Sequence, residues 1–180
     1  EEYQVNQKRL RAQGVYTMTD YIIPMPMETY ESVVQGVSDI ISDGQHDRIQ
    51  FNNLSILPNA EMGDPEYQEK YGMEIVNLKI INGHGKKNDS ISGIDERQEL
   101  VIATSTMPKL EWRKTRIFCW MTNLLYFNKL LQLPTLFLHE LGGVAYGEVF
   151  RIFCEIQSDE YPIISEVNAF FAKTAQDMQD

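Results

Sequence analysis

A strand-helix-strand pattern near the start of the chain restricts its fold more than any other feature. Val15–Ile23 is rich in β-branched and aromatic residues and stops at Pro24, which predicts a largely buried strand. Glu28–Ser42 has the 3/4 apolar spacing of an amphipathic helix, and Arg48–Leu57 alternates as a second strand. This order predicts a βαβ unit with parallel pairing and a right-handed crossover.

The rest of the chain predicts further helices with a few extended segments. Helices are expected at Gln4–Gln13, after the Asp64-Pro65 cap up to Gly72, at Pro108–Gln132, from Pro134 to Gly142, at Ala145–Gln157 and at Tyr161–Gln176, and extended segments at Met73–Ile81 and Glu99–Ser105. The polar, Gly-rich stretch 82–90 is expected to be a mobile excursion. The predicted fold class is therefore α/β, with a mainly helical C-terminal half.

Charge and composition exclude several classes of partner. The 180 residues carry a formal net charge of -10, and the pI is near 4.8, so phosphate backbones and anionic membranes are not expected as partners. No apolar run reaches the length of a membrane span. Cys119 and Cys154 lie in apolar stretches, where cysteine behaves as a small buried hydrophobe, and this usage fits the reducing cytoplasm.

The common catalytic and metal-binding motifs are absent from the sequence. The Gly83–Lys87 stretch lacks the spacing of a P-loop, so it is expected to be a solvated surface loop. His46, His84 and His139 do not reach zinc-ligand spacing with the cysteines. The acidic run Glu61–Glu69 is expected to cap and solvate a helix start rather than to catalyse.

Several segments, in order, resemble the later part of the cobalamin-binding radical SAM enzymes, the group that includes oxidative magnesium-protoporphyrin ester cyclase-like proteins. Tyr21–Ser32 is similar to the family's strand ending in Gly-Leu-Pro-Gly-Glu-Thr. The other similar segments are Gly44–Ile49, Leu57–Met62, Asp64-Pro65, Lys70–Gly72, Val101–Thr106 and Trp112.

The resemblance implies a fold, a set of cofactors and a site. The fold would be strand-helix units of a partial TIM-like barrel, with ligands at the carboxyl ends of the strands. Two strand ends would line the adenine side of an S-adenosylmethionine pocket, and their cofactor-binding residues would be Ile23, Met25, Glu28, Asn52, Leu54 and Pro58. The implied mechanism is one-electron reduction of S-adenosylmethionine by a [4Fe-4S] cluster, giving a 5′-deoxyadenosyl radical that abstracts hydrogen from a small-molecule substrate. Methyl transfer, ring formation and oxidation all remain open as the reaction.

The sequence departs from the family at two points. Glycines are usual in the family where this chain has Met25 and Met27, so methionine side chains would occupy the approach to the adenosyl group. The Cys-x3-Cys-x2-Cys run that ligates the cluster is absent, since the chain has only two cysteines.

The missing cysteine run predicts a C-terminal fragment that is inactive alone, with the cluster and cobalamin held by upstream domains of the same polypeptide. Residues 1–82 would then belong to the barrel, 83–98 would form a flexible loop and 99–180 a helical extension. Because a cut barrel exposes a sheet edge, we also expect a homodimer of this chain or a rearranged sheet. The alternative is a non-catalytic binding or assembly module, with Met18, Met25 and Met27 at its contact edge unless they fill the core.

Overall fold

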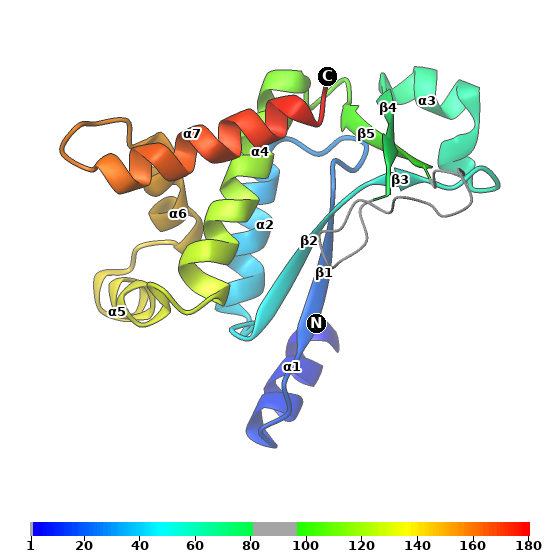
Figure 1. The fold of residues 1–180 in the computed structure, drawn as a ribbon. Coiled ribbons are helices and arrows are strands. Elements are labelled where there is room, and N and C mark those ends of the chain that lie inside the picture. Colours follow the sequence, from blue (N-terminus) through cyan, green and yellow to red (C-terminus); the bar gives the residue numbers. More distant parts are fainter. Residues whose placement is uncertain (1, 81–96) are drawn as a thin grey trace, which may run out of the picture.

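The computed structural model describes residues 2–80 and 97–180 (Figure 1). The elements are, in chain order, α1 (Glu2–Ala12), β1 (Met18–Ile23), α2 (Tyr30–Ser42), β2 (Arg48–Asn53), β3 (Ser55–Ile56), the 3-10 turn η1 (Glu61–Gly63), α3 (Pro65–Tyr71), β4 (Glu74–Lys79), β5 (Arg97–Ala103), α4 (Lys109–Thr122), the π-helical turn η2 (Asn123–Phe127), α5 (Gln132–Gly142), α6 (Tyr146–Glu155) and α7 (Pro162–Asp177).

The strands form two small sheets. β1 and β2 pair in parallel, with Met18 opposite Arg48 and Ile23 opposite Asn53, so the predicted βαβ unit is confirmed. β3, β5 and β4 form a three-stranded antiparallel sheet in that order. The mixed α/β class and the helical C-terminal half are also confirmed, but the described residues form no closed barrel.

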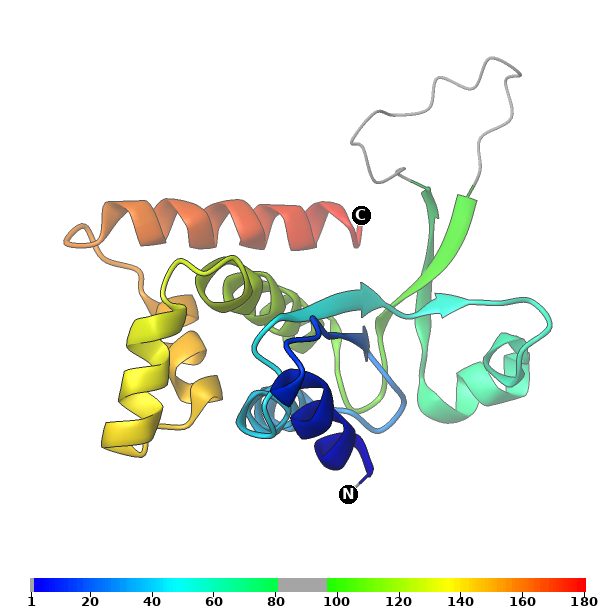
Figure 2. The ribbon, with the colours of Figure 1, turned by 90° about the horizontal axis from the view of Figure 1, so that it is seen from below.

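The helical half packs against one face of the β1–β2 pair (Figure 1). α4 contacts α2, α6 and α7, and the view in Figure 2 shows it between α2 and α7. The main core joins apolar residues from the βαβ unit to residues from this half. They include Ile23, Val33, Val37, Ile49, Trp112, Phe118, Tyr126 and Phe150.

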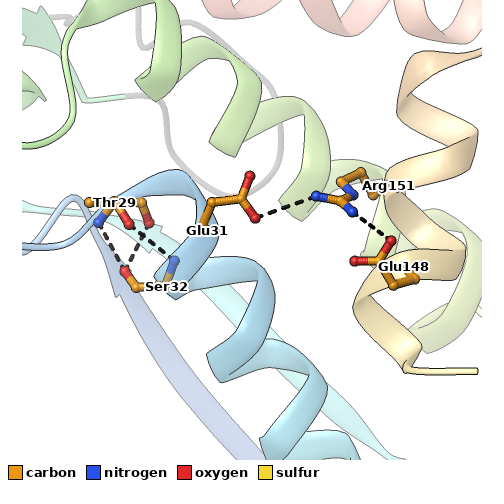
Figure 3. Close-up of polar contacts among 5 residues, drawn as sticks. All are labelled: Thr29, Glu31, Ser32, Glu148 and Arg151. Carbon is orange, nitrogen blue, oxygen red and sulfur yellow. Dashed lines mark hydrogen bonds and ion pairs between the residues drawn. The ribbon is translucent and has the colours of Figure 1, made fainter.

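The start of α2 is fixed by a capping box (Figure 3). The Thr29 hydroxyl accepts from the Ser32 backbone N–H at 3.1 Å, and the Ser32 hydroxyl accepts from the Thr29 N–H at 2.9 Å. Arg151 of α6 reaches both Glu31 of α2 and Glu148 of its own helix. The capping box satisfies backbone donors at the end of α2 that faces the carboxyl edge of β1.

The prediction of one strand at Arg48–Leu57 is wrong. This segment divides at Leu54 into two strands, which belong to different sheets. The Leu54 backbone N–H donates to the Ile23 carbonyl at 2.7 Å, and its carbonyl accepts from the Val101 N–H at 2.9 Å. Leu54 is therefore bonded to β1 on one side and to β5 on the other. The chain passes here from a parallel to an antiparallel partner.

Two further predictions need correction. The strand predicted at Val15–Ile23 is shorter than expected and is not largely buried. The helical half covers only one face of the two-stranded sheet, so Met18 and Ile22 are exposed, whereas Ile23 is fully buried. The helix predicted at Pro108–Gln132 ends earlier, since Lys129 takes a left-handed backbone conformation with φ 67°. The Lys129 ammonium donates to the His46 carbonyl at 2.7 Å, and this bond joins the end of the helical segment to the loop before β2.

The other helix predictions agree with the structure. Asp64 caps α3 by accepting from the Glu66 N–H at 2.9 Å, and Gly72 ends that helix in a left-handed conformation, so the capping interpretation of the acidic run is confirmed there. The Gly-rich stretch 82–90 lies outside the described residues, and the boundaries 1–82, 83–98 and 99–180 stay a prediction. Among the described helices, none is long and apolar enough to cross a membrane.

Candidate functional site

The loop after β1 is organised around the carboxylate of Glu28. One oxygen accepts from the Tyr21 hydroxyl at 3.0 Å, and the other accepts from the Met25 backbone N–H at 3.0 Å. Met25–Glu28 is a type II turn, because the Glu28 N–H donates to the Met25 carbonyl, Pro26 is the second residue and Met27 has φ 69°. Glu28 therefore holds the turn that follows the strand.

Partial burial sets the electrostatics of this carboxylate. Burial raises the pKa of Glu28 above its ordinary value, and the hydrogen bonds from Met25 and Tyr21 oppose that rise in part. Tyr21 fits against α2 because residue 36 is glycine: a Cβ there would come within 2.8 Å of the Tyr21 hydroxyl oxygen. The Tyr21–Glu28 pair thus depends on a close approach between β1 and α2.

The outer face of the parallel pair carries a polar network. The Asn52 amide nitrogen donates to an Asp20 carboxylate oxygen at 2.9 Å, and the Gln50 amide nitrogen donates to the Asn52 amide oxygen at 3.3 Å. These side chains lie on the face opposite the core, where alternate residues of β1 and β2 are wholly or partly exposed. Polar side chains near the carboxyl ends of parallel strands are suited to binding a small ligand.

The loop between β5 and α4 reaches the same edge. The Thr106 hydroxyl donates to the Glu28 carbonyl at 2.7 Å, although the two residues are 78 positions apart in the chain. The Asn53 amide nitrogen donates to the Val101 carbonyl at 3.0 Å, while its buried amide oxygen has no partner among the described residues. Three strand ends, those of β1, β2 and β5, therefore meet around Glu28.

Five of the six predicted site residues lie at this edge, whereas Pro58 lies beyond it in the loop after β3. Ile23 and Leu54 are buried, Glu28 is bonded through both oxygens, Asn52 is on the outer face, Met25 is half-buried and Pro58 is exposed. Their role in binding a cofactor stays a prediction. Sequence reasoning missed Asp20, Tyr21 and Thr106. Strand alternation would place Asp20 on the same face as Asn52, and the Val101–Thr106 segment was already part of the family resemblance.

The residues present do not fit an iron-sulfur cluster. The chain has two cysteines, on α4 and α6, and the [4Fe-4S] cluster that the resemblance implies takes three thiolates. Burial raises the pKa of Cys119, and it raises that of Cys154 to about 12, so both remain thiols at neutral pH. In the part of the chain that the structure describes, no three His, Cys, Asp or Glu residues are grouped to hold a metal ion.

Comparison with known proteins agrees with the family resemblance. No protein-family model matches the chain. The cobalamin-dependent radical SAM methyltransferase TokK of Streptomyces tokunonensis is 29% identical to it over 152 residues, which cover 84% of this chain and 22% of TokK. The chain is a distant homologue of cobalamin-dependent radical SAM methyltransferases.

A second methyltransferase matches in the same way. The 2-(S-pantetheinyl)-carbapenam-3-carboxylate methyltransferase of Streptantibioticus cattleyicolor is 26% identical over 152 residues, which cover 82% of this chain and 22% of that protein. The chain thus spans about a fifth of the length of the curated relatives it matches. The resemblance predicted from the Tyr21–Ser32 and Val101–Thr106 segments is therefore confirmed as distant homology over most of the chain.

Proposed function

We propose that this chain forms one side of the S-adenosylmethionine pocket of a cobalamin-dependent radical SAM methyltransferase. The observation that carries the proposal is the homology to two methyltransferases over 152 residues. The parallel β1–β2 pair supports it, because its exposed outer face carries Asp20, Gln50 and Asn52 beside Met18 and Ile22. In this account the rest of the pocket, the cluster and the cobalamin belong to upstream domains of a longer polypeptide.

The six predicted residues divide into contact and support roles. Asn52 and Met25 would contact the adenosyl group, because they flank the open end of the strand pair. Glu28 would position the Met25–Glu28 turn, because its two oxygens accept from the Met25 N–H within that turn and from the Tyr21 hydroxyl. Ile23 and Leu54 would fix the strand ends from inside the core.

Pro58 is exposed beyond β3 and would border the pocket. When bound, S-adenosylmethionine supplies the radical and methyl-transfer chemistry, and this chain supplies binding, orientation and exclusion of water.

Two alanine variants of the native polypeptide test this assignment. Asn52→Ala removes an amide at the open strand end, and the loss of one hydrogen bond is expected to raise the KM for S-adenosylmethionine about fivefold. Asn6→Ala makes the same change on the exposed surface of α1 and should leave this KM unchanged. Equal effects of the two variants, or a polypeptide that does not cleave S-adenosylmethionine, would contradict the proposal.

The second candidate function is a non-catalytic binding or assembly module. The observation that favours it is apolar exposure: Met18 and Met27 face solvent rather than filling the core, and Leu133, Phe137 and Leu141 project from α5. Light scattering and a pulldown from source cells test it. A chain that stays monomeric and recovers no partner would count against this alternative.

A further inference from the structure

Helix α5 lies at the outer end of the helical half (Figure 1), and one of its faces is apolar and exposed. Leu133, Phe137 and Leu141 follow one another at four-residue spacing, which places them on this face, with Leu138 beside them. Between 49% and 83% of the surface of each of these four residues is exposed. With Pro134, they expose roughly 500–600 Å², which is as much as the largest apolar patch of an ordinary monomer.

The opposite face of α5 attaches the helix to its neighbours. Thr135 is buried, and its hydroxyl donates to the Leu131 carbonyl at 2.7 Å. The His139 ring stacks on the Tyr146 ring of α6, with 4.2 Å between the ring centres, and Gly143 ends α5 in a left-handed conformation. The apolar face is therefore held toward solvent in a fixed orientation, and a partner that binds it pays little for ordering the helix.

The chemistry of this face favours an apolar partner. Residues 130–139 contain no Asp, Glu, Lys or Arg, so the face offers no charge to a charged surface. The net charge of -10 also disfavours the headgroups of an anionic membrane. A shallow groove of about 560 Å³ runs along the face, and it can receive apolar side chains of a facing helix. Its lining residues are Pro134, Phe137, Leu138, Leu141 and Gly142.

The apolar row is symmetric about its middle residue, so it can pair with itself. Two copies of α5 that cross antiparallel place Leu133 opposite Leu141 of the partner subunit, with Phe137 at the two-fold axis. Joining the two faces would remove about 1,000–1,200 Å² from water, the least that a specific interface requires. We propose that the exposed face of α5 is the interface through which this chain binds a second copy of itself.

This interface is separate from the edge described above. The proposed S-adenosylmethionine contacts lie on β1 and β2 and in the loops that follow them, whereas the interface lies on α5. It also differs from the open sheet edge through which the sequence predicted a dimer. Self-association can be measured without any cofactor or methyl transfer. A failure of either proposal therefore leaves the other intact.

Sedimentation equilibrium of the 180-residue chain tests the proposal. A dimer is expected, with a dissociation constant on the order of 1–10 µM for an interface of this small size. Added salt should strengthen the association, because it screens the repulsion between two chains of net charge -10, and an apolar interface loses nothing to screening. A chain that is monomeric at about 100 µM would overturn the proposal and leave an upstream segment of the polypeptide as the occupant. Association that weakens with salt would also overturn it.

Variants then assign the dimer to α5. Phe137→Glu should weaken dimerisation by at least about tenfold, because each copy loses an anchor and brings a charge into the apolar interface. Phe170→Glu is the matched control, since Phe170 lies on α7 with nearly the same exposure, 66% against 63% for Phe137, and this variant should still dimerise. Equal weakening by the two variants would overturn the assignment.

Leu141→Glu is the second α5 variant, and it should weaken dimerisation as Phe137→Glu does. It gives the decision if far-UV circular dichroism shows that Phe137→Glu does not fold, because 83% of the surface of Leu141 is exposed and the fold does not depend on it. A dimer that persists in Leu141→Glu would refute the α5 interface and point to another surface, such as the open edge of β1.

Discussion

Met27 offers a direct test of the turn that shapes the candidate site. It is the third residue of the type II turn Met25–Glu28, with φ 69°, and 74% of its surface is exposed. A residue with a Cβ is strained in this conformation, whereas glycine is not. The side chain buries little, so replacing it should act almost entirely through the backbone.

The size of the effect follows from two opposing terms. Removing the left-handed strain of a non-glycine residue is worth roughly 1–2 kcal/mol. The greater freedom of glycine in the unfolded chain offsets about 0.5–1 kcal/mol of this. Met27→Gly should therefore stabilise the fold by about 0.5–1 kcal/mol, which raises the melting temperature by roughly 1–4 °C for a chain of this size.

Met27→Ala is the matched control, because alanine keeps the Cβ and hence the strain. Thermal unfolding followed by circular dichroism should give the order Met27→Gly above Met27→Ala, with the alanine variant close to the parent chain. A glycine variant that melts at or below the alanine variant would contradict this order. It would mean that the turn is not left-handed at this position.

Three more predictions concern stability measured by urea unfolding. Gly147→Ala should destabilise the chain by about 1–3 kcal/mol, because a Cβ there would lie 2.8 Å from the Val34 carbonyl oxygen. Gly142→Ala is the control and should be nearly neutral, because a Cβ at residue 142 would make only ordinary contact, 3.6 Å from Val144. Thr29→Ala should lose about 1 kcal/mol with the capping box, and no loss would contradict the cap. Burial lowers the pKa of His46 to about 4. The unfolded chain therefore takes up a proton near pH 6.5 and the folded chain only near pH 4, so stability should fall by about 1–2 kcal/mol between these values, after allowance for partial exposure. His46→Gln should remove that slope.

Helix-capping residues and hydrophobic periods in the sequence predicted the elements whose ends are set by neighbouring residues. The α3 boundaries follow from Asp64-Pro65 at its start and Gly72 at its end, and the structure has these caps. The β1–α2–β2 unit follows from its hydrophobic periods. The rule that parallel strand ends share an edge predicted the common position of Ile23, Glu28 and Asn52, but not that of Pro58, which lies beyond β3.

Contacts between distant segments were not predictable in the same way. The strand break at Leu54 arises from a bond to Val101, 47 residues later, and the helix break at Lys129 is held by His46. Periodicity contains no information about such partners. The role of Glu28 was likewise hidden, because only the folded chain brings Tyr21 and the Met25 N–H onto its two oxygens.

An immunoblot of source cells, with an antibody against this chain, gives the mass of the native polypeptide. We expect a band well above 20.8 kDa, because the proposed function assigns the cluster and the cobalamin to other parts of the same polypeptide. A single band at 20.8 kDa would contradict it, since a chain with two cysteines cannot ligate the cluster that the proposed reaction requires.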